Sequence, residues 1–293
     1  MRIVFIGAVQ FSFHSMKKLL ELQANIVGVC TLQESKSNAD HVDLSDLANS
    51  HGIPCHYADD INSRDSINWI MRQKPDVIFC FGWSRLLKRE LLTLTSKGVV
   101  GFHPAALPAN RGRHPLIWAL ALGLDNTAST FFFIGEKADD GDIISQEEII
   151  ISNDDDAKSL YAKMTKVALK QIELFFHQLI DGKCSRTKQD ELSSNNWRKR
   201  SKEDGVIDWR MSANSIHNLV RALGFPYVGA SFVCGEKEVK IWETVIVKNV
   251  PNNIEPGKII AKTENGPLVM CGEGAICIIT SDLASELNVG EYL

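Results

Sequence analysis

The sequence DVIFCF, residues Asp76–Phe81, is a short and almost entirely apolar run in a chain of 293 residues. A run of this kind, without alternating polar residues, is typical of a strand buried on both faces of a parallel sheet. Strand patterns also cover Arg2–Ile6, Asn25–Thr31 and Gly98–Phe102. Helical patterns lie between these strands, and this alternation predicts an α/β fold with a Rossmann-like, mostly parallel sheet.

The other expected elements follow from periodicity and from turn residues. Helices are predicted over Ser12–Leu22, Asp43–His51, Ser66–Gln73, Leu86–Leu94, Leu116–Leu122 and Ser159–Ile180, with further strands over Ala128–Ile134 and Ile149–Ile151. One more helix, Ser212–Leu223, precedes short β runs at Ala230–Cys234, Val239–Val247, Lys258–Ala261, Leu268–Met270 and Ile276–Ile279. We therefore predict a catalytic domain over residues 1–182, a polar linker over 183–204, and a smaller β-rich, OB-like domain over 205–293.

The overall composition excludes several classes of protein. Hydrophobic residues make up 44% and charged residues 23%, and no apolar run approaches the length of a membrane span. The first residues show no signal-peptide pattern, so we expect a cytoplasmic protein. The formal net charge of −4 argues against nucleic acid as a partner. The seven cysteines have no metal-site spacing, so we expect reduced thiols and no metal, while a homodimer remains open.

Two phosphate-binding motifs are absent from the sequence. After the first strand Gly7 stands alone, without the GxGxxG pattern of dinucleotide-binding proteins, which argues against NAD. The P-loop pattern is also missing. The start of the helix near Ser12 remains a candidate anion site.

The stretch GFHPAALPANRGRHP, Gly101–Pro115, is predicted to be a loop at the carboxyl end of a strand. Its three prolines fix backbone angles and stiffen it. The side chain that such a loop can present for chemistry is His103, because histidine exchanges protons near neutral pH. The alternative is a histidine that only hydrogen-bonds to the backbone.

A second candidate is the acidic turn Asp139-Asp140-Gly141-Asp142, which follows the strand over Ala128–Ile134. A carboxylate from this turn could orient the His103 ring and raise its basicity. The alternatives are a solvated turn or an acidic calcium loop. The spacing of an EF-hand is missing, which argues against a metal.

Several separated motifs resemble one family in order along the chain. HPAALPANRG (His103–Gly112) and ADDGDII (Ala138–Ile144) resemble signatures of the formyltransferases that use N10-formyltetrahydrofolate, and PDVIFCFGWSRLLKREL (Pro75–Leu91) resembles their folate-side strand. KRSKEDGVIDW (Lys199–Trp209) and IHNLVRALGFPYVGA (Ile216–Ala230) resemble the C-terminal domain shared by methionyl-tRNA formyltransferases and the longer sugar N-formyltransferases.

The resemblance implies that an amine attacks the formyl group of N10-formyltetrahydrofolate, with His103 and Asp139 as the catalytic pair. It places the formyl donor against a set of residues near two strand ends: Phe81, Gly82, Trp83, Leu86, Leu107 and Asp139. For Trp83 an ordinary core position is the alternative.

Two positions depart from the family pattern. The family has an asparagine two residues before the histidine, where it holds the oxyanion, and this chain has Gly101 at that position. Where the family motif has a serine, this chain has Ala105. Loss of an oxyanion donor can reduce the rate on the order of a hundredfold. We expect Asn110, on the same loop, to replace it, so that the predicted catalytic residues are His103, Asp139 and Asn110.

The acceptor is predicted to be a nucleotide-linked amino sugar. Candidate substrate contacts are Phe11 and Ser12, Asn38 and Asp40 in the loop over 33–40, and the basic residues Lys199 and Arg200, which are either a pyrophosphate clamp or solvated surface. The loop SNADHVDL and the tract GRHPLIWALALG resemble enzymes of pseudaminic-acid-type pathways, which implies a UDP-linked 4-amino-4,6-dideoxy sugar. The alternatives are a methionyl-tRNA formyltransferase, a formyltetrahydrofolate hydrolase, and a non-catalytic binder.

Overall fold

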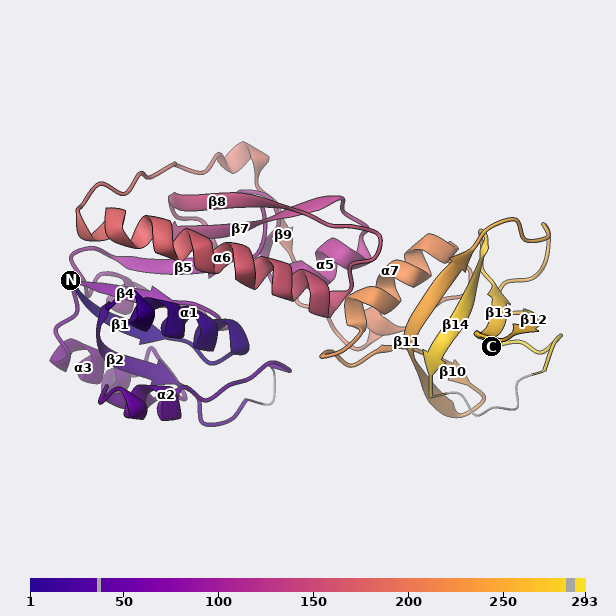
Figure 1. Cartoon of the computed structure of the whole chain (residues 1–293), viewed down its shortest axis with the longest axis horizontal. Coiled ribbons are helices and arrows are strands. Elements are labelled where there is room, and N and C mark those ends of the chain that lie inside the picture. The colour runs from indigo at the N-terminus through magenta and orange to yellow at the C-terminus, as the bar shows by residue number, and fades with distance from the viewer. Residues whose placement is uncertain (36–37, 283–287) are drawn as a thin grey trace. The chain divides into compact units, whose positions relative to one another are not determined.

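The computed structural model describes residues 1–35, 38–282 and 288–293 (Figure 1). It divides into two compact units. The N-terminal unit comprises Met1–Gly112, Thr127–Ile149 and Ala162–Trp197, and the C-terminal unit comprises Arg113–Asn126, Ile150–Tyr161 and Arg198–Leu293. The segment predicted as a linker, 183–204, is thus divided after Trp197, and the exact domain boundaries stay a prediction.

The N-terminal unit is built on a seven-stranded sheet in the order β3-β2-β1-β4-β5-β7-β8. Its strands are β1 (Arg2–Ile6), β2 (Asn25–Thr31), β3 (Cys55–Tyr57), β4 (Val77–Cys80), β5 (Val99–His103), β7 (Asn126–Phe133) and β8 (Ile143–Ile150). The first five of these pair in parallel, and β7 pairs antiparallel to β5. The predicted α/β fold with a mostly parallel sheet is confirmed.

Seven α-helices lie along the described chain: α1 (Gln10–Glu21), α2 (Ser45–Ser50), α3 (Arg64–Arg72), α4 (Arg89–Leu92), α5 (Pro115–Ala121), α6 (Ala157–Ile180) and α7 (Ala213–Leu223). In the N-terminal unit, α1 and α6 cover one face of the sheet and α3 covers the other (Figure 1). The helices therefore cover both faces of the sheet, as the alternating pattern predicts.

The two faces have different cores. On the α6 face, Phe79 of β4 and Phe81, which directly follows β4, meet Phe131 of β7 and Phe175 of α6 through ring contacts of 4.8–6.5 Å. On the α3 face the core is aliphatic and includes two cysteines: Val4, Ile6, Cys30, Ile67, Ile70, Ile78 and Cys80. Burial raises the pKa of the Cys80 thiol to about 12, so this residue packs as an unreactive apolar group.

The C-terminal unit contains a five-stranded antiparallel sheet in the order β10-β11-β14-β13-β12. Its strands are β10 (Ala230–Cys234), β11 (Lys237–Val247), β12 (Ile259–Thr263), β13 (Gly266–Met270) and β14 (Ala275–Ser281). Ser212 caps α7 by accepting a hydrogen bond from the Ser215 amide. A small β-rich domain is confirmed, and its likeness to an OB fold stays a prediction.

The structure differs from the sequence prediction mainly in polar segments. Strand β8 begins at Ile143, six residues before the predicted start, because its polar residues Gln146–Glu148 hide the strand from an apolar pattern. Helix α4 is only a four-residue turn. The short strands β3, β6 (Arg111–Gly112) and β9 (Asn196–Trp197) carry too few residues for any periodicity. In the part of the chain that is described, no helix is long and apolar enough to cross a membrane.

Candidate functional site

His103 is the last residue of β5 and pairs with Thr130 of β7. The sequence predicts that the strand ends at Phe102 and that a loop follows, and this is corrected: the sheet itself positions His103. The segment after it is also not entirely irregular, since β6 forms at Arg111–Gly112 and pairs in parallel with β9. Only 4% of His103 is exposed, so the surrounding protein determines how its ring is oriented.

Both ring nitrogens of His103 face oxygen acceptors. Nε2 lies 2.8 Å from the main-chain carbonyl of Asn110, and Nδ1 lies 3.5 Å from Oδ2 of Asp139. A carbonyl oxygen only accepts hydrogen bonds, so we assign the proton to Nε2. A protonated ring would find an acceptor on each side. The structure thus brings together His103 and Asp139, which lie 36 positions apart in the sequence.

The Asp139 carboxylate is held from the other side by the backbone. Its Oδ2 accepts a hydrogen bond of 2.9 Å from the Gly112 amide. The residue itself adopts φ +56°, a left-handed conformation that is uncommon for non-glycine residues. The side chain is 19% exposed, so it is neither a solvated turn residue nor fully buried. Among the described residues, no group of three His, Cys, Asp or Glu side chains is arranged to hold a metal.

Asn110 contacts His103 through its backbone and not through its side chain. Its amide donates to Oδ1 of Asn195, and its own Oδ1 accepts from the Asn195 side chain at 3.2 Å. These contacts engage the carboxamide oxygen of Asn110, and the role of its Nδ2 group as an oxyanion donor stays a prediction. The main-chain carbonyl of Asn110 fixes the His103 tautomer.

The position of the missing asparagine is filled by neighbouring apolar side chains. A Cβ atom built at Gly101 would lie 2.7 Å from Cγ1 and 2.9 Å from Cδ1 of Ile134, and 3.2 Å from the Phe132 ring. These distances are shorter than carbon atoms normally allow. The departure at Gly101 thus has a local structural reason, because an asparagine would require Ile134 to move.

The residues predicted to bind the formyl donor occupy different environments. Phe81 and Leu107 are buried and Leu86 is 64% exposed. Gly82 has φ +73°, and a Cβ there would lie 2.3 Å from Val9 Cγ2. Trp83 packs against the aliphatic core of the α3 face, yet its indole nitrogen is buried and finds no hydrogen-bond partner among the described residues. Residues Phe81–Trp83 follow β4, the strand adjacent to β5, and so share the sheet edge of His103. Their contact with a donor stays a prediction.

The predicted acceptor residues near α1 have largely structural contacts. Phe11 stacks on Phe102 with 4.1 Å between ring centroids. Ser12 is fully buried, and its hydroxyl donates to the Phe81 carbonyl at 2.5 Å while accepting from the Val9 amide. In this structure the Ser12 hydroxyl links the segments that follow β1 and β4, and its contact with an acceptor stays a prediction.

The loop that carries Asn38 and Asp40 lies against the same region. Oδ1 of Asn38 accepts from the Ser84 hydroxyl, and the Asp40 carbonyl accepts from the Gln10 amide at the start of α1. Lys36 and Ser37 of the predicted loop over 33–40 lie outside the described residues. The structure therefore brings Asn38 and Asp40 next to the segments that follow β1 and β4.

Lys199 and Arg200 belong to the C-terminal unit. Trp118 of α5 lies beside this basic segment, a contact that the sequence did not predict. The guanidinium groups of Arg198 and Arg200 lie 5.2 and 5.7 Å from the centre of the Trp118 ring. Burial lowers the pKa of His114, and nearby cations, including Arg200 and Lys199, lower it further. This aromatic and basic cluster (Arg113, His114, Trp118, Arg198, Lys199 and Arg200) concentrates positive charge.

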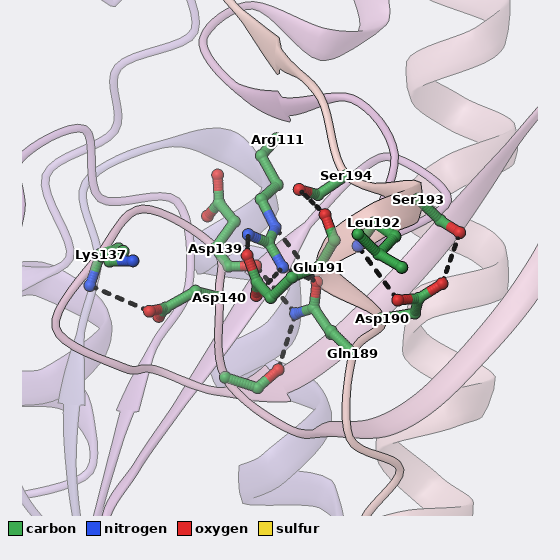
Figure 2. A network of polar contacts seen from close by, with 11 residues as sticks. Arg111, Lys137, Asp139, Asp140, Gln189, Asp190, Glu191, Leu192, Ser193 and Ser194 are labelled. Carbon is green, nitrogen blue, oxygen red and sulfur yellow. Dashed lines mark hydrogen bonds and ion pairs between the residues drawn. The ribbon is translucent and has the colours of Figure 1, made fainter.

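Two residues near Asp139 were missed by the sequence analysis. Arg111 is 4% exposed, and its guanidinium donates to Gln189 and Glu191 at 2.8–3.2 Å. Figure 2 shows Arg111 between these two side chains, beside the turn that carries Asp139 and Asp140. Arg111 lies inside the HPAALPANRG motif, which is a usable signal, whereas Gln189 lies in the predicted linker and has none.

Solved structures of known proteins share this fold. The structure is similar to WlaRD, a sugar 3N-formyltransferase determined with dTDP and 5-N-formyl-THF, with a TM-score of 0.73 and 18% identity over 97% of this chain and 98% of that chain. It is also similar to an N-formyltransferase from Helicobacter canadensis in complex with folinic acid and dTDP-3-aminofucose, with a TM-score of 0.73 and 17% identity over 95% and 98% of the two chains.

A methionyl-tRNA formyltransferase from Clostridium thermocellum has a TM-score of 0.63 and 16% identity over 85% of this chain and 95% of that chain. At these identities the structural matches show a shared fold. The sequence itself matches two family models, described as formyl transferase over residues 1–173 and as formyl transferase, C-terminal domain, over residues 199–289. Since the first of these models alone spans more than half of the chain, the protein belongs to the formyltransferase family of enzymes.

Proposed function

We propose that this enzyme is a sugar N-formyltransferase that moves a formyl group from N10-formyltetrahydrofolate to the amine of a nucleotide-linked amino-deoxy sugar. The observation that carries the proposal is the placement of His103 at the end of β5, between the Asp139 carboxylate and the Asn110 carbonyl. This pair can exchange protons beside a reacting amine. Family membership supplies the class of reaction.

The proposed reaction forms one carbon–nitrogen bond and breaks another. The unprotonated amine attacks the formyl carbon, whose carbonyl oxygen becomes an oxyanion. The amine then loses a proton, and collapse of the intermediate breaks the bond to N10 of the folate, which takes up a proton as it leaves. We assign the proton transfers to His103 with Asp139 as its charge partner. The contact of Nδ1 with Asp139, at 3.5 Å, is longer than that of Nε2 with Asn110. We therefore propose that Nδ1 is the ring nitrogen that takes a proton from the substrate.

The choice of donor is supported by relatives whose structures were determined with folates. In this chain the donor is proposed to lie near Phe81–Trp83. The unpartnered indole nitrogen of Trp83 is a hydrogen-bond donor at that strand end. The pterin ring of a folate carries acceptor atoms, so the chemistry of this residue fits such a ligand.

The choice of acceptor is supported by the sugar N-formyltransferases among the structural matches, one of which was determined with a dTDP-amino sugar. The resemblance of SNADHVDL and GRHPLIWALALG to enzymes of pseudaminic-acid-type pathways favours a UDP-linked 4-amino-4,6-dideoxy sugar, so both UDP- and dTDP-linked sugars belong in the test. Asn38 and Asp40 are proposed to hydrogen-bond to hydroxyl groups of the sugar. Lys199 and Arg200 are proposed to bind the diphosphate, because their cluster concentrates positive charge.

The proposal is tested by incubating the purified protein with N10-formyltetrahydrofolate and a panel of UDP- and dTDP-linked amino sugars, with products identified by mass spectrometry. We expect a formylated sugar nucleotide, and its loss in His103→Asn. Formate released without any acceptor would instead indicate a hydrolase. Formylation of methionyl-tRNA with no sugar product would also contradict the proposal. If ligands bind and no acceptor is formylated, the protein is a binder.

A further inference from the structure

Asp139 is held in place by contacts to its carboxylate and also to its backbone. Nε2 of Gln189 donates to the carbonyl of Asp139 at 2.8 Å and to the carbonyl of Gly141 at 2.7 Å. Gln189 is 5% exposed, so water does not compete freely for these bonds. Because Asp139 adopts a left-handed conformation, its turn needs such external contacts to persist.

The orientation of the Gln189 carboxamide follows from its neighbours. Its Oε1 accepts from Nε and Nη2 of Arg111 at 3.2 and 2.8 Å. A guanidinium only donates and carbonyls only accept, so the amide must point its oxygen at Arg111 and its nitrogen at the Asp139 turn. Both ends of the carboxamide are thereby used, and Figure 2 shows Gln189 reaching from Arg111 to this turn.

These contacts close a ring around the candidate catalytic carboxylate. Arg111 immediately precedes Gly112, whose amide donates to the Asp139 carboxylate at 2.9 Å. The path therefore runs from Gln189 to Arg111, through the peptide bond to Gly112, to the Asp139 carboxylate, and back through the Asp139 carbonyl to Gln189. The charge of Arg111 is balanced by Glu191, whose side chain is 62% exposed. Figure 2 draws no hydrogen bond between Glu191 and the turn that carries Asp139.

We infer that Gln189 is a positioning residue that sets the distance between the Asp139 carboxylate and His103. It acts through the turn and through Arg111, without contact to the reacting groups. A displacement of a catalytic group by about 1 Å can reduce turnover by two orders of magnitude. Loss of the Gln189 contacts should therefore reduce turnover more than it reduces substrate binding.

Two variants separate the two ends of the carboxamide. Gln189→Met has a similar length and removes all four contacts, while Gln189→Glu keeps the acceptor for Arg111 and loses the donor for the Asp139 turn. Asp190→Asn is the matched control on the same segment, because Asp190 bonds only to Leu192 and Ser193 in Figure 2. Thermal unfolding checks that each variant is folded.

The first measurement requires no substrate. Ring nitrogen spectra of His103 by NMR report the surroundings of Nδ1, and we expect both Gln189 variants to shift the Nδ1 signal in the same direction as Asp139→Asn. The Asp190→Asn spectrum should match that of the unmodified protein. Because no acceptor is present, this result stands even if the proposed sugar substrate is wrong.

The second measurement rests on the proposed function. With the identified acceptor, kcat should fall about tenfold or more in both Gln189 variants, while KM for the formyl donor stays within about twofold. Asp190→Asn should keep kcat within about twofold. The inference is overturned if the His103 ring signals of both Gln189 variants are unchanged, even where the melting temperature falls, or if Gln189→Glu retains full turnover.

Discussion

Arg111 and Arg200 lie in different units, and they differ in how many of their guanidinium nitrogens donate hydrogen bonds within the protein. All three nitrogens of the Arg111 guanidinium donate to Gln189 or Glu191. Arg200 donates through Nη2 to the Asp204 carbonyl, and its buried Nε has no hydrogen-bond partner in the described ranges. A saturated guanidinium builds structure, whereas one with unused donors can bind an added anion.

The surrounding charges sharpen this difference. Arg111 has one exposed carboxylate, Glu191, and a neutral amide as partners. Arg198, Lys199 and Arg200 are three cations beside Asp204, whose pKa is held well below its usual range by hydrogen bonds from Arg198 and Ser201. Burial lowers the pKa of Arg200. The charge of the region around Arg111 is therefore neutralised by its own residues, while the region around Arg200 keeps an excess of positive charge.

The largest effect is expected from Arg111→Met. The substitution leaves Oε1 of Gln189 buried without a donor and removes the charge partner of Glu191. A buried polar group that loses its partner costs about 1–3 kcal/mol, so we expect the unfolding free energy to fall by about 2 kcal/mol. Denaturant unfolding measures it. A loss below about 0.5 kcal/mol would mean that Arg111 does not hold this region together.

The second effect is expected from Gly101→Asn, which restores the family residue inside the first region. The new Cβ would overlap Ile134, and overpacking of a core typically costs about 1–3 kcal/mol. In the double variant Gly101→Asn/Ile134→Ala the losses of the two single variants should be less than additive, because the overlapping side-chain carbons are gone. Thermal melts of the single and double variants check this. If Gly101→Asn melts at the temperature of the unmodified protein, the glycine has another explanation.

A smaller effect is expected from Lys199→Ala in the second region. Lys199 is exposed, so the melting temperature should stay unchanged while KM for the nucleotide-linked acceptor rises about tenfold, as for loss of one charge-assisted contact. Steady-state kinetics at low and high salt measure it. Lys74→Ala, a lysine in the turn between α3 and β4, is the control and should change neither value. An unchanged KM for Lys199→Ala would place the diphosphate elsewhere.

The smallest effect is a dependence of stability on pH that involves His114, which belongs to the aromatic and basic cluster around Trp118. Its pKa is lowered in the folded protein by burial and by Arg113, Arg200 and Lys199. The unfolded chain therefore binds more protons as the pH falls below about 6.5, so stability is present above that pH and declines below it. We expect a decline of less than about 1 kcal/mol between pH 7.5 and 5.5, since the residue is only half buried.

His114→Asn should flatten that slope. His56 and His217 also have pKa values lowered mainly by burial, so they contribute with the same sign and a residual slope will remain. Melting temperatures at several pH values provide the comparison. If the melting temperatures of His114→Asn and the unmodified protein fall equally with pH, His114 does not contribute to the pH dependence of stability.

Much of the fold was predictable because it rests on apolar periodicity. The parallel strands and the long helix α6 have continuous or regularly spaced apolar residues, so their existence and type follow from the sequence. The strand β8 and the pair β6 and β9 do not, because Gln146–Glu148 are polar and two-residue strands have no period. Their pairing depends on contacts between distant segments.

The site divides in the same way. His103 and Asp139 were predicted because histidine and aspartate carry recognisable chemistry at strand ends, and their contact is present. The contact that holds the Asn110 side chain was not predictable, because its partner Asn195 lies 85 positions away in a segment predicted to be a linker. Gln189 was missed for the same reason. A polar segment without a motif gives no local sign that its side chains hold a turn.

The backbone of the segment Asn110–Gly112 has a consequence for exchange with solvent. Its three successive amides donate to three acceptors on other segments: Oδ1 of Asn195, the carbonyl of Asn195, and the carboxylate of Asp139. Amide hydrogens exchange only when such bonds open, so these three should exchange as slowly as those of a sheet and should open together. The loop beside His103 would then respond to a bound ligand as one cooperative element, with a single opening rate for all three amides.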